Sequence, residues 1–331
     1  MKPLYVLLLL LLIIAGLVFV CDWGYKHLLW RFVSHRTAVF IRWGTAIGLI
    51  LLTIGVFHHG SHHTRYEVEV KPVTIQSARV PKGFEGFRIA HISDLHVNTL
   101  NDERGKAFLR EAFDSIVTQR PDIICFTGDL VSMESHEAEP FREELRYLAS
   151  HGIPVYSILG NHDYADYTGQ AKAWRKADTE RLIQLQKDCG WIMLNNSYLD
   201  LTRGEDTLRL VGVENIGEPP FSTYGHLRKA MGGFDAANDR FTLLLSHNPT
   251  HWRREILPET KVDLTLSGHT HAMQFRILGW SPVSWRYKEW GDLYAEGHQL
   301  LYVNTGLGCV GYPGRVGVRP EVTILTLSRG R

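Results

Sequence analysis

Five short clusters of Asp, Asn and His recur along the chain, and each follows an apolar segment with the composition of a buried strand. In chain order they are Asp94-Leu95-His96, Gly128-Asp129, Gly160-Asn161-His162-Asp163, His247 and Gly268-His269-Thr270-His271. Loops at the carboxyl ends of strands in an open α/β sheet converge on the ligand crevice, so these side chains are expected to meet in space. Glycine precedes several of them because the chain must turn sharply there and leave room for a ligand.

The clusters supply carboxylates, one amide oxygen and several imidazoles, but no thiolate. This ligand set suits Mn²⁺, Fe or Zn²⁺ better than it suits a thiolate zinc site or a Ca²⁺ cage. A single Asp-x-His or His-x-His pair is a weak signal, because polar residues commonly cap the loops that follow strands. Clusters repeated in this order, each behind a buried strand, argue against loop capping and predict a metal centre.

The elements that must position these clusters alternate between strand and helix. Buried strands are predicted before the clusters at residues 87–92, 122–126, 155–159, 241–245 and 264–266. Further strands are predicted at 66–73, 191–195, 198–202, 208–213, 300–303 and 322–327, and helices at 102–119, 140–150 and 172–187. The alternation predicts an α/β sheet covered by helices, and the stretches with strands alone predict a mixed sheet or a pair of sheets.

The ordered motifs D-x-H, GD, GNH(D/E), H and GHxH within residues 94–271 resemble those of the calcineurin-like metallophosphoesterases. The opening ISDLH and the closing SGHTH are similar to the membrane-associated bacterial branch of that family. The resemblance extends from about Gly86 to the C-terminus. It implies a sandwich of two mixed β-sheets flanked by helices, and we assign this metallophosphoesterase domain to residues 65–331.

The same resemblance implies two divalent transition-metal ions (Mn, Fe or Zn), each with its own ligands. The first set is Asp94, His96 and His271, and the second set is Asn161, His247 and His269. Asp129 is the expected bridge between the two ions. His162 is the expected general acid that protonates the leaving oxygen, and Asp163 is expected to orient it.

These roles agree with the physical chemistry of phosphoryl transfer. Two cations roughly 3.5–4 Å apart can share a hydroxide and clamp the phosphoryl oxygens during in-line attack. An imidazole with a pKa of about 6.5 is suited to protonating the leaving alkoxide. The expected activity is hydrolysis of a phosphoester or diphosphate bond through a metal-bridging hydroxide. The alternative is a catalytically silent scaffold with this fold at the membrane, against which the complete ligand set and His162 argue.

The first sixty residues differ from the rest of the chain. Residues 3–20 form an uncharged apolar run that approaches the ~20 residues a spanning helix needs. Residues 40–57 form a second run, interrupted only by Arg42. A cleaved signal peptide is the alternative for the first run, but no small-x-small cleavage site follows it. We therefore predict a membrane anchor of two transmembrane helices over residues 1–58, in a multi-pass protein of the cell membrane.

The charges around the two apolar runs predict an orientation in the lipid bilayer. Lys26, Arg31 and Arg36 lie between the runs, which favours a cytoplasmic loop and an extracytoplasmic catalytic domain. Lys2 before the first run opposes this orientation. Membrane anchoring also favours a lipid-linked substrate, such as a nucleotide-diphosphate glycolipid, over a small soluble phosphoester.

Three other segments carry polar or aromatic residues without a definite role. The histidines in residues 58–63 are interpreted as a solvated juxtamembrane spacer rather than a metal site. The aromatic stretch 280–294 has no regular helical or strand period and is predicted to be a loop that packs over the sheet edge, with a lip toward lipid as the alternative. Thr305 stands where many relatives are expected to carry Arg, so Arg315 is either a substitute phosphate contact or a surface charge. Ala272 replaces a common Gly and should preserve the ligands.

Composition excludes some other functions. The net charge of +1 gives no support to nucleic-acid binding, which we do not expect. The four cysteines are scattered without a CxxC pair, which argues against a zinc-thiolate site and a disulfide framework. Cys125 lies in an apolar run and is interpreted as a buried thiol.

Overall fold

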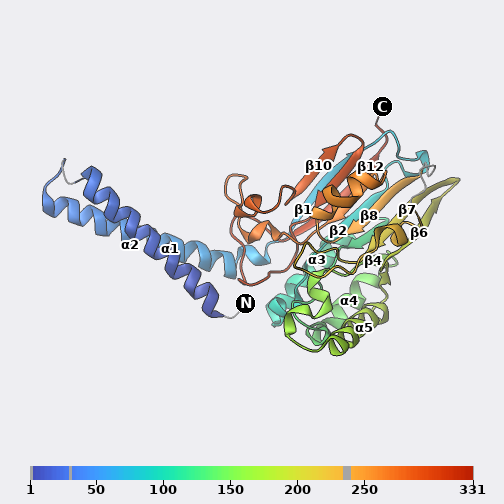
Figure 1. Ribbon diagram of the computed structural model, residues 1–331, viewed down its shortest axis with the longest axis horizontal. Coiled ribbons are helices and arrows are strands. Elements are labelled where there is room, and N and C mark those ends of the chain that lie inside the picture. The colour runs from blue at the N-terminus through green and yellow to red at the C-terminus, as the bar shows by residue number, and fades with distance from the viewer. Residues whose placement is uncertain (1–2, 30–31, 234–239, 331) are drawn as a thin grey trace.

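Two mixed six-stranded sheets organise the computed structural model, which describes residues 3–29, 32–233 and 240–330 (Figure 1). The first sheet has the order β1-β12-β2-β3-β4-β5. Its strands are β1 (Glu69–Gln76), β12 (Glu321–Ser328), β2 (Arg88–Ile92), β3 (Ile123–Phe126), β4 (Val155–Ser157) and β5 (Ile192–Met193). Only the pairing of β12 with β2 is antiparallel in this sheet.

The second sheet has the order β10-β11-β9-β8-β7-β6. Its strands are β10 (Asp292–Glu296), β11 (Gln299–Val303), β9 (Leu264–Ser267), β8 (Phe241–Ser246), β7 (Asp206–Val213) and β6 (Ser197–Arg203). The two outer pairings are antiparallel and the three inner pairings are parallel. Two mixed sheets flanked by helices confirm the expected α/β architecture.

The apolar runs become strands because both faces of the first sheet are covered. All four residues of β3 are buried. Ile123 and Cys125 pack into the core between the two sheets, whereas Ile124 and Phe126 pack against the helices outside. This alternation is the two-residue period of a strand, and a parallel strand buried on both faces has no polar positions to spare.

Three helices cover the outer face of the first sheet: α3 (Glu103–Thr118), α4 (Arg142–Ala149) and α5 (Lys172–Asp188). The carboxylate of Asp102 caps α3 by accepting the backbone N–H of Gly105 at 2.6 Å. Phe108, Phe113 and Ile116 of α3 are buried on the sheet, as their helical spacing predicts. Shorter helices, α6 (Leu227–Ala230) and α7 (Leu257–Glu259), lie on the second sheet's side.

Two predicted element boundaries are wrong for local reasons. The strand expected at 66–73 begins only at Glu69, because Thr64–Tyr66 form a 3₁₀ turn after the preceding helix. The aromatic stretch 280–294 is irregular only at first, with a 3₁₀ turn at Pro282–Trp285. Its end, from Asp292, is strand β10, which the loop prediction missed because its polar and apolar residues show no clear alternation.

The N-terminal residues form a helical arm that extends away from the sheets (Figure 1). It consists of α1 (Pro3–Gly24), a π-helical turn at Tyr25–Leu29, and α2 (His35–His62). Asp22 links the two helices by pairing with Arg42 at 2.6 Å. Within the described residues, one helical segment, His35–Tyr66, is long and apolar enough to cross a membrane. The structure thus supports one apolar N-terminal helix of that kind, and the two-span anchor stays a prediction.

The expected solvated spacer at 58–63 is helical, because residues 58–62 form the end of α2 and His63 is its C-cap. Its histidines are exposed, as expected, and stack in pairs one turn apart, with ring centroids of His58 and His62 4.2 Å from each other. The four cysteines are free, and Cys125 is fully buried, which confirms its interpretation as a buried thiol.

Candidate metal centre

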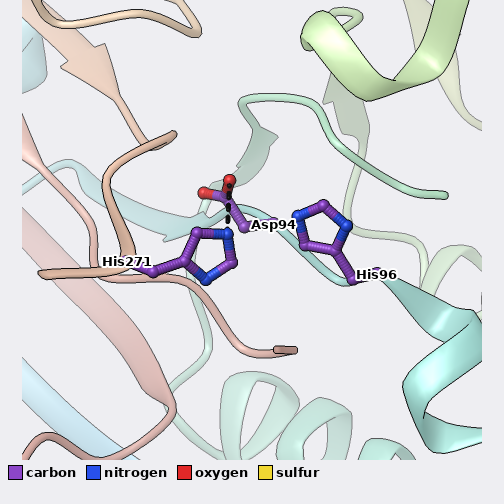
Figure 2. Close-up of side chains that lie close together, drawn as sticks. All are labelled: Asp94, His96 and His271. Carbon is purple, nitrogen blue, oxygen red and sulfur yellow. Dashed lines mark ion pairs between the residues drawn. The ribbon is translucent and has the colours of Figure 1, made fainter. Parts of the chain in front are cut away.

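Asp94, His96 and His271 form a first buried group of ligand atoms (Figure 2). Asp94 and His96 follow β2, and His271 follows β9 of the other sheet. His271 Nε2 lies 3.2 Å from the Asp94 carboxylate, and the rings of His96 and His271 are 5.0 Å apart. The ends of two strands from different sheets therefore meet here, as the strand-end pattern predicts.

A second group consists of Asp129, His247 and His269, with Asn161 beside them. The side-chain oxygen of Asn161 lies 2.8 Å from His269 Nδ1 and 3.0 Å from His247 Nε2. His247 Nε2 and His269 Nδ1 are 3.2 Å apart. Two imidazole nitrogens and an amide oxygen that converge at such distances form a donor set that fits a cation.

Asp129 lies between the two groups. One carboxylate oxygen is 3.2 Å from His247 Nε2 and 3.6 Å from His96 Nε2. The other accepts the backbone N–H of His162 at 2.8 Å. Ligand atoms of His96, Asp129 and His162 also lie close enough to form a group of their own. A carboxylate placed in this way can face two cations at once.

Five of the seven ligand residues in these groups have an unusual backbone conformation. The φ angles are +53° for Asp94, +39° for His96, +60° for Asp129, +73° for His269 and +51° for His271. The left-handed region is uncommon for residues other than glycine and costs of order 1–3 kcal/mol each. Strain concentrated on the ligand residues is typical of a functional site whose side chains are held for a purpose other than stability.

Two glycines of the motifs are needed for close approach. A Cβ on Gly160 would lie 2.2 Å from an Asp129 carboxylate oxygen, and one on Gly268 would lie 2.2 Å from an Asp94 carboxylate oxygen. Gly160 has φ −94°, so its backbone does not require glycine. These glycines therefore leave room for the neighbouring ligand carboxylates. The sequence prediction that glycine provides space at these positions is confirmed.

Three imidazoles are oriented by a hydrogen bond on the ring nitrogen that faces away from the centre. His96 Nδ1 is 3.0 Å from the Ser132 hydroxyl, and His247 Nδ1 is 2.8 Å from the Thr127 carbonyl oxygen. His269 Nε2 is 2.9 Å from the hydroxyl of Tyr287. Metal-binding histidines usually donate their second ring N–H in this way, which fixes the ring and its tautomer.

Unsatisfied nitrogens and shifted pKa values test whether these residues fit metal ions. His96 Nε2 and His271 Nδ1 are buried without a hydrogen-bond partner, and His271 Nε2 faces the Asp94 carboxylate at 3.2 Å. Burial lowers the pKa of His96 well below its usual value and that of His269 to about 3, so both are neutral. Burial also opposes ionisation of Asp129, but His247 and other imidazoles nearby outweigh it and lower its pKa. Neutral imidazoles and ionised carboxylates are the forms that ligate metals.

The pKa of His247 is shifted upward, so this imidazole holds its proton more tightly than a free imidazole does. Burial disfavours its charge, but the carboxylates of Asp129 and Asp94 outweigh this and raise the pKa of His247 to about 9. A cation bound at Nε2 would replace that proton. The donor set of these residues therefore fits a pair of metal ions.

We expected Asp163 to orient His162. Among the residues that the structure describes, no hydrogen bond joins these two side chains. His162 Nδ1 is instead 2.7 Å from the carbonyl oxygen of Ser132. The Asp163 carboxylate accepts the backbone N–H groups of Asp129 at 2.8 Å and Gly160 at 2.9 Å. Burial and the Asp129 charge raise the pKa of Asp163 to about 7. Asp163 therefore joins two ligand-bearing loops. The residue that orients the His162 ring is Ser132, through its backbone carbonyl oxygen.

The side-chain amide of Asn161 is oriented by a residue that the sequence analysis missed. Asn161 Nδ2 donates to the hydroxyl of Tyr167 at 2.9 Å, which turns the amide oxygen toward the second group. The Tyr167 ring also lies 4.6 Å from the His162 ring. Tyr287 was likewise missed, although the aromatic composition of 280–294 had singled out its segment. Ser132 carried no sequence signal.

Both readings of Arg315 are wrong. Its side chain is fully buried, so it is no surface charge. The guanidinium donates to the carbonyl oxygens of Thr305 at 3.0 Å, Gly306 at 2.9 Å and Gly308 at 2.6 Å. Because these donors are used on the main chain, Arg315 organises the loop beside the first group instead of binding phosphate.

The aromatic stretch 280–294 divides between two environments. Trp285 is 82% exposed and Trp280 is 45% exposed, so the expected packing over the sheet edge is wrong for them. Tyr287 contacts His269, and the Trp290 carbonyl oxygen accepts the Thr270 hydroxyl at 2.6 Å. One part of the stretch therefore faces outward while the next part supports the second ligand group.

Comparison with known proteins agrees with this site. The family model described as calcineurin-like phosphoesterase matches residues 87–273, more than half of the chain. The chain belongs to this family, and with its buried Asp and His groups it is a metallophosphoesterase.

Three relatives illustrate the family around this chain. It is 28% identical over 290 residues to the uncharacterized metallophosphoesterase YkuE of Bacillus subtilis (strain 168), covering 82% of this chain and 90% of that one. It is 27% identical over 295 residues to a Danio rerio transmembrane protein with metallophosphoesterase domain, covering 86% of this chain but only 63% of the relative. It is 27% identical over 290 residues to the UDP-2,3-diacylglucosamine pyrophosphatase LpxG of Chlamydia trachomatis, covering 71% and 83%.

Proposed function

We propose that this metallophosphoesterase hydrolyses a phosphoester or diphosphate bond of a lipid-linked substrate at a membrane surface. The observation that carries the hydrolytic part is the position of Asp129, whose carboxylate faces His96 of one ligand group and His247 of the other. The pyrophosphatase LpxG, whose name identifies a diacylated sugar nucleotide as its substrate, supports the lipid-linked class.

We assign the ligands as two sets joined by Asp129. The first set is Asp94, His96 and His271, and the second is Asn161, His247 and His269. Two divalent ions bound there would supply a nucleophilic hydroxide and charge stabilisation for in-line attack on phosphorus. The amide of Asn161 adds an oxygen donor without negative charge, which leaves the site net attractive to a phosphate.

We assign His162 as the group that protonates the leaving oxygen. Its Nδ1 faces the Ser132 carbonyl oxygen, so that nitrogen carries hydrogen and Nε2 remains for exchange with substrate. The Tyr167 ring beside it limits its rotation. Donation from Nε2 to the departing oxygen is general acid catalysis, and Asp163 acts only by holding the Gly160 and Asp129 backbones.

The membrane part of the proposal rests on the N-terminal arm. α2 provides an apolar segment of spanning length, and α1 packs against it. We assign the two helices as a membrane hairpin whose basic loop stays in the cytoplasm, which exports the catalytic domain. The transmembrane relative from Danio rerio supports anchoring of such a domain. A reporter fused after Arg331 tests the orientation: alkaline phosphatase activity is expected, and fluorescence of a cytoplasm-only reporter would reverse it.

The central experiment is hydrolysis by the purified full chain in detergent after metal loading. The substrates are an activated aryl phosphodiester, an aryl phosphomonoester, and a nucleoside-diphosphate diacylated sugar in mixed micelles. We expect turnover of the glycolipid diphosphate, lost in Asp129→Asn and retained in Asp200→Asn, a surface control paired with Arg240. A protein with two bound ions and no turnover of any substrate would favour the silent scaffold.

A further inference from the structure

An exposed apolar surface lies on the loops between β9 and β10. Its large side chains are Met273, Ile277, Leu278, Trp280 and Trp285, and we call these five residues the apolar lip. Leu278 is fully exposed, and Met273 is 59% exposed. Ile277 and Trp280 form a tight turn through reciprocal backbone hydrogen bonds of 2.9 Å and 3.0 Å, which presents Leu278 at its tip.

The apolar lip is continuous with α2. The backbone N–H of Arg276, next to Ile277, donates to the Val316 carbonyl oxygen at 2.8 Å. Val316 in turn contacts α2 so closely that a Cβ on Gly60 would lie 3.1 Å from its Cγ2. Arg315 N–H also donates to the Gly60 carbonyl oxygen at 3.0 Å. Figure 1 shows the orange loops that carry the lip beside the end of α2.

The contact with α2 reaches into its apolar part. Val316 and Gly317 line a cavity of about 490 Å³ together with Leu51, Leu52 and Val56 of α2. Leu51 and Leu52 lie within the segment of spanning length and are each 63% exposed. A loop that faces this part of α2 lies at the level of the bilayer surface or below it if α2 spans the membrane.

The apolar lip is also joined to the metal centre at both of its ends. Met273 comes two residues after His271, and residues 271–274 all have positive φ, from +49° to +56°. The Gln274 side chain holds this strained segment by donating to the carbonyl oxygens of Tyr312 and Gly314 at 2.6 Å and 2.8 Å. At the other end, Trp285 comes two residues before Tyr287, which contacts His269.

We infer that the apolar lip inserts into the lipid bilayer beside α2 and opens the metal centre toward the membrane surface. Tryptophan and large aliphatic side chains favour the boundary between lipid headgroups and acyl chains. Burying such a surface there removes apolar area from water, which stabilises the membrane-bound state. The substrate class that follows is a phosphate or diphosphate carried on a membrane-embedded lipid. The inference rests on the proposed anchoring by α2, but not on the proposed hydrolysis.

The test measures the depth of single labels on the full chain in phosphatidylcholine–phosphatidylglycerol vesicles. A Cys21→Ser background removes the partly exposed cysteine, since the other three are buried. Leu278→Cys reports the apolar lip, Leu51→Cys reports α2, and Ile192→Cys reports β5, at the far edge of the first sheet from β1. Each variant carries a polarity-sensitive fluorophore and is measured with and without nitroxide-labelled lipids.

We expect nitroxide lipids to cause a loss of fluorescence at positions 51 and 278 and none at position 192. Loss at 51 without loss at 278 overturns the apolar lip and leaves the anchor standing. No loss at 51 or 278 overturns both the anchor and the inference. Because no substrate is present, these outcomes are independent of whether the hydrolysis assay succeeds.

Discussion

The hydroxyl of Tyr287 lies 2.9 Å from Nε2 of His269, whose Nδ1 faces Asn161 and His247. This contact holds the imidazole with Nδ1 turned into the second ligand group. Tyr287 comes from an irregular segment between β9 and β10, so the loop that carries the apolar lip also sets the geometry of a metal ligand.

Tyr287→Phe tests this support. The substitution removes the hydroxyl and keeps the ring, and we expect a roughly 10–100-fold loss of metal affinity at the second group. Calorimetric metal titration of the full chain in detergent measures it. Tyr294→Phe is the matched control, because the Tyr294 hydroxyl contacts the Trp290 backbone N–H instead. Unchanged affinity in Tyr287→Phe would show that the hydrogen bond has no role in binding.

Asp129→Asn is expected to reduce the bound metal from close to two ions per chain to nearly none, because its carboxylate faces both groups. Asp94→Asn removes a carboxylate from the first group alone and should leave about one ion. Elemental analysis of purified proteins compares them. Equal losses in the two variants would contradict the bridging position of Asp129.

His162→Ala should keep the metals and the fold but slow turnover by roughly 10²–10⁴-fold on a substrate with a poor leaving group. An activated aryl leaving group needs less protonation, so its rate should fall less. Steady-state kinetics on the two substrates give the comparison. If both rates fell by the same factor, His162 would not be the acid.

The buried carboxylate of Glu321, which lies outside the metal centre, should make the free energy of unfolding depend on pH. This carboxylate lies 2.8 Å from Lys71 Nζ and accepts the hydroxyls of Tyr302 at 2.7 Å and Thr305 at 2.9 Å. Burial opposes its ionisation, but Lys71 and the hydroxyls outweigh this and lower the pKa of Glu321. A folded-state pKa below the unfolded value of about 4.3 contributes stability that is present above that pH and lost as pH falls through the folded pKa.

Glu321→Gln should therefore lower the free energy of unfolding by about 2 kcal/mol at pH 7, since the charged hydrogen bonds are lost. The difference from the wild type should shrink below about pH 4.3. Thermal unfolding of both proteins, followed by tryptophan fluorescence between pH 3 and pH 8 in one detergent, measures it. Glu205→Gln, at an exposed position between β6 and β7, serves as the control. A difference that stays constant down to the lowest pH would contradict the assigned pKa direction.

The amino-acid sequence determined the strands and the order of the polar clusters behind them. Apolar runs such as residues 123–126 have no polar position for either face, so they become buried strands. The residues that follow such a strand must lie at the carboxyl end of the sheet. For this reason Asp94, Asp129 and His247 could be brought to one site without knowledge of the loops.

Only the tertiary structure decided the contacts made by loops and by side chains distant in the chain. No pattern shows that Asp163 turns to backbone N–H groups instead of His162, or that Arg315 is buried under the loop at 305–308. Trp285 is exposed, whereas Tyr287, two residues later in the same irregular segment, contacts His269. Periodicity identifies a face only where the backbone repeats, and irregular loops take their path from the surfaces they meet.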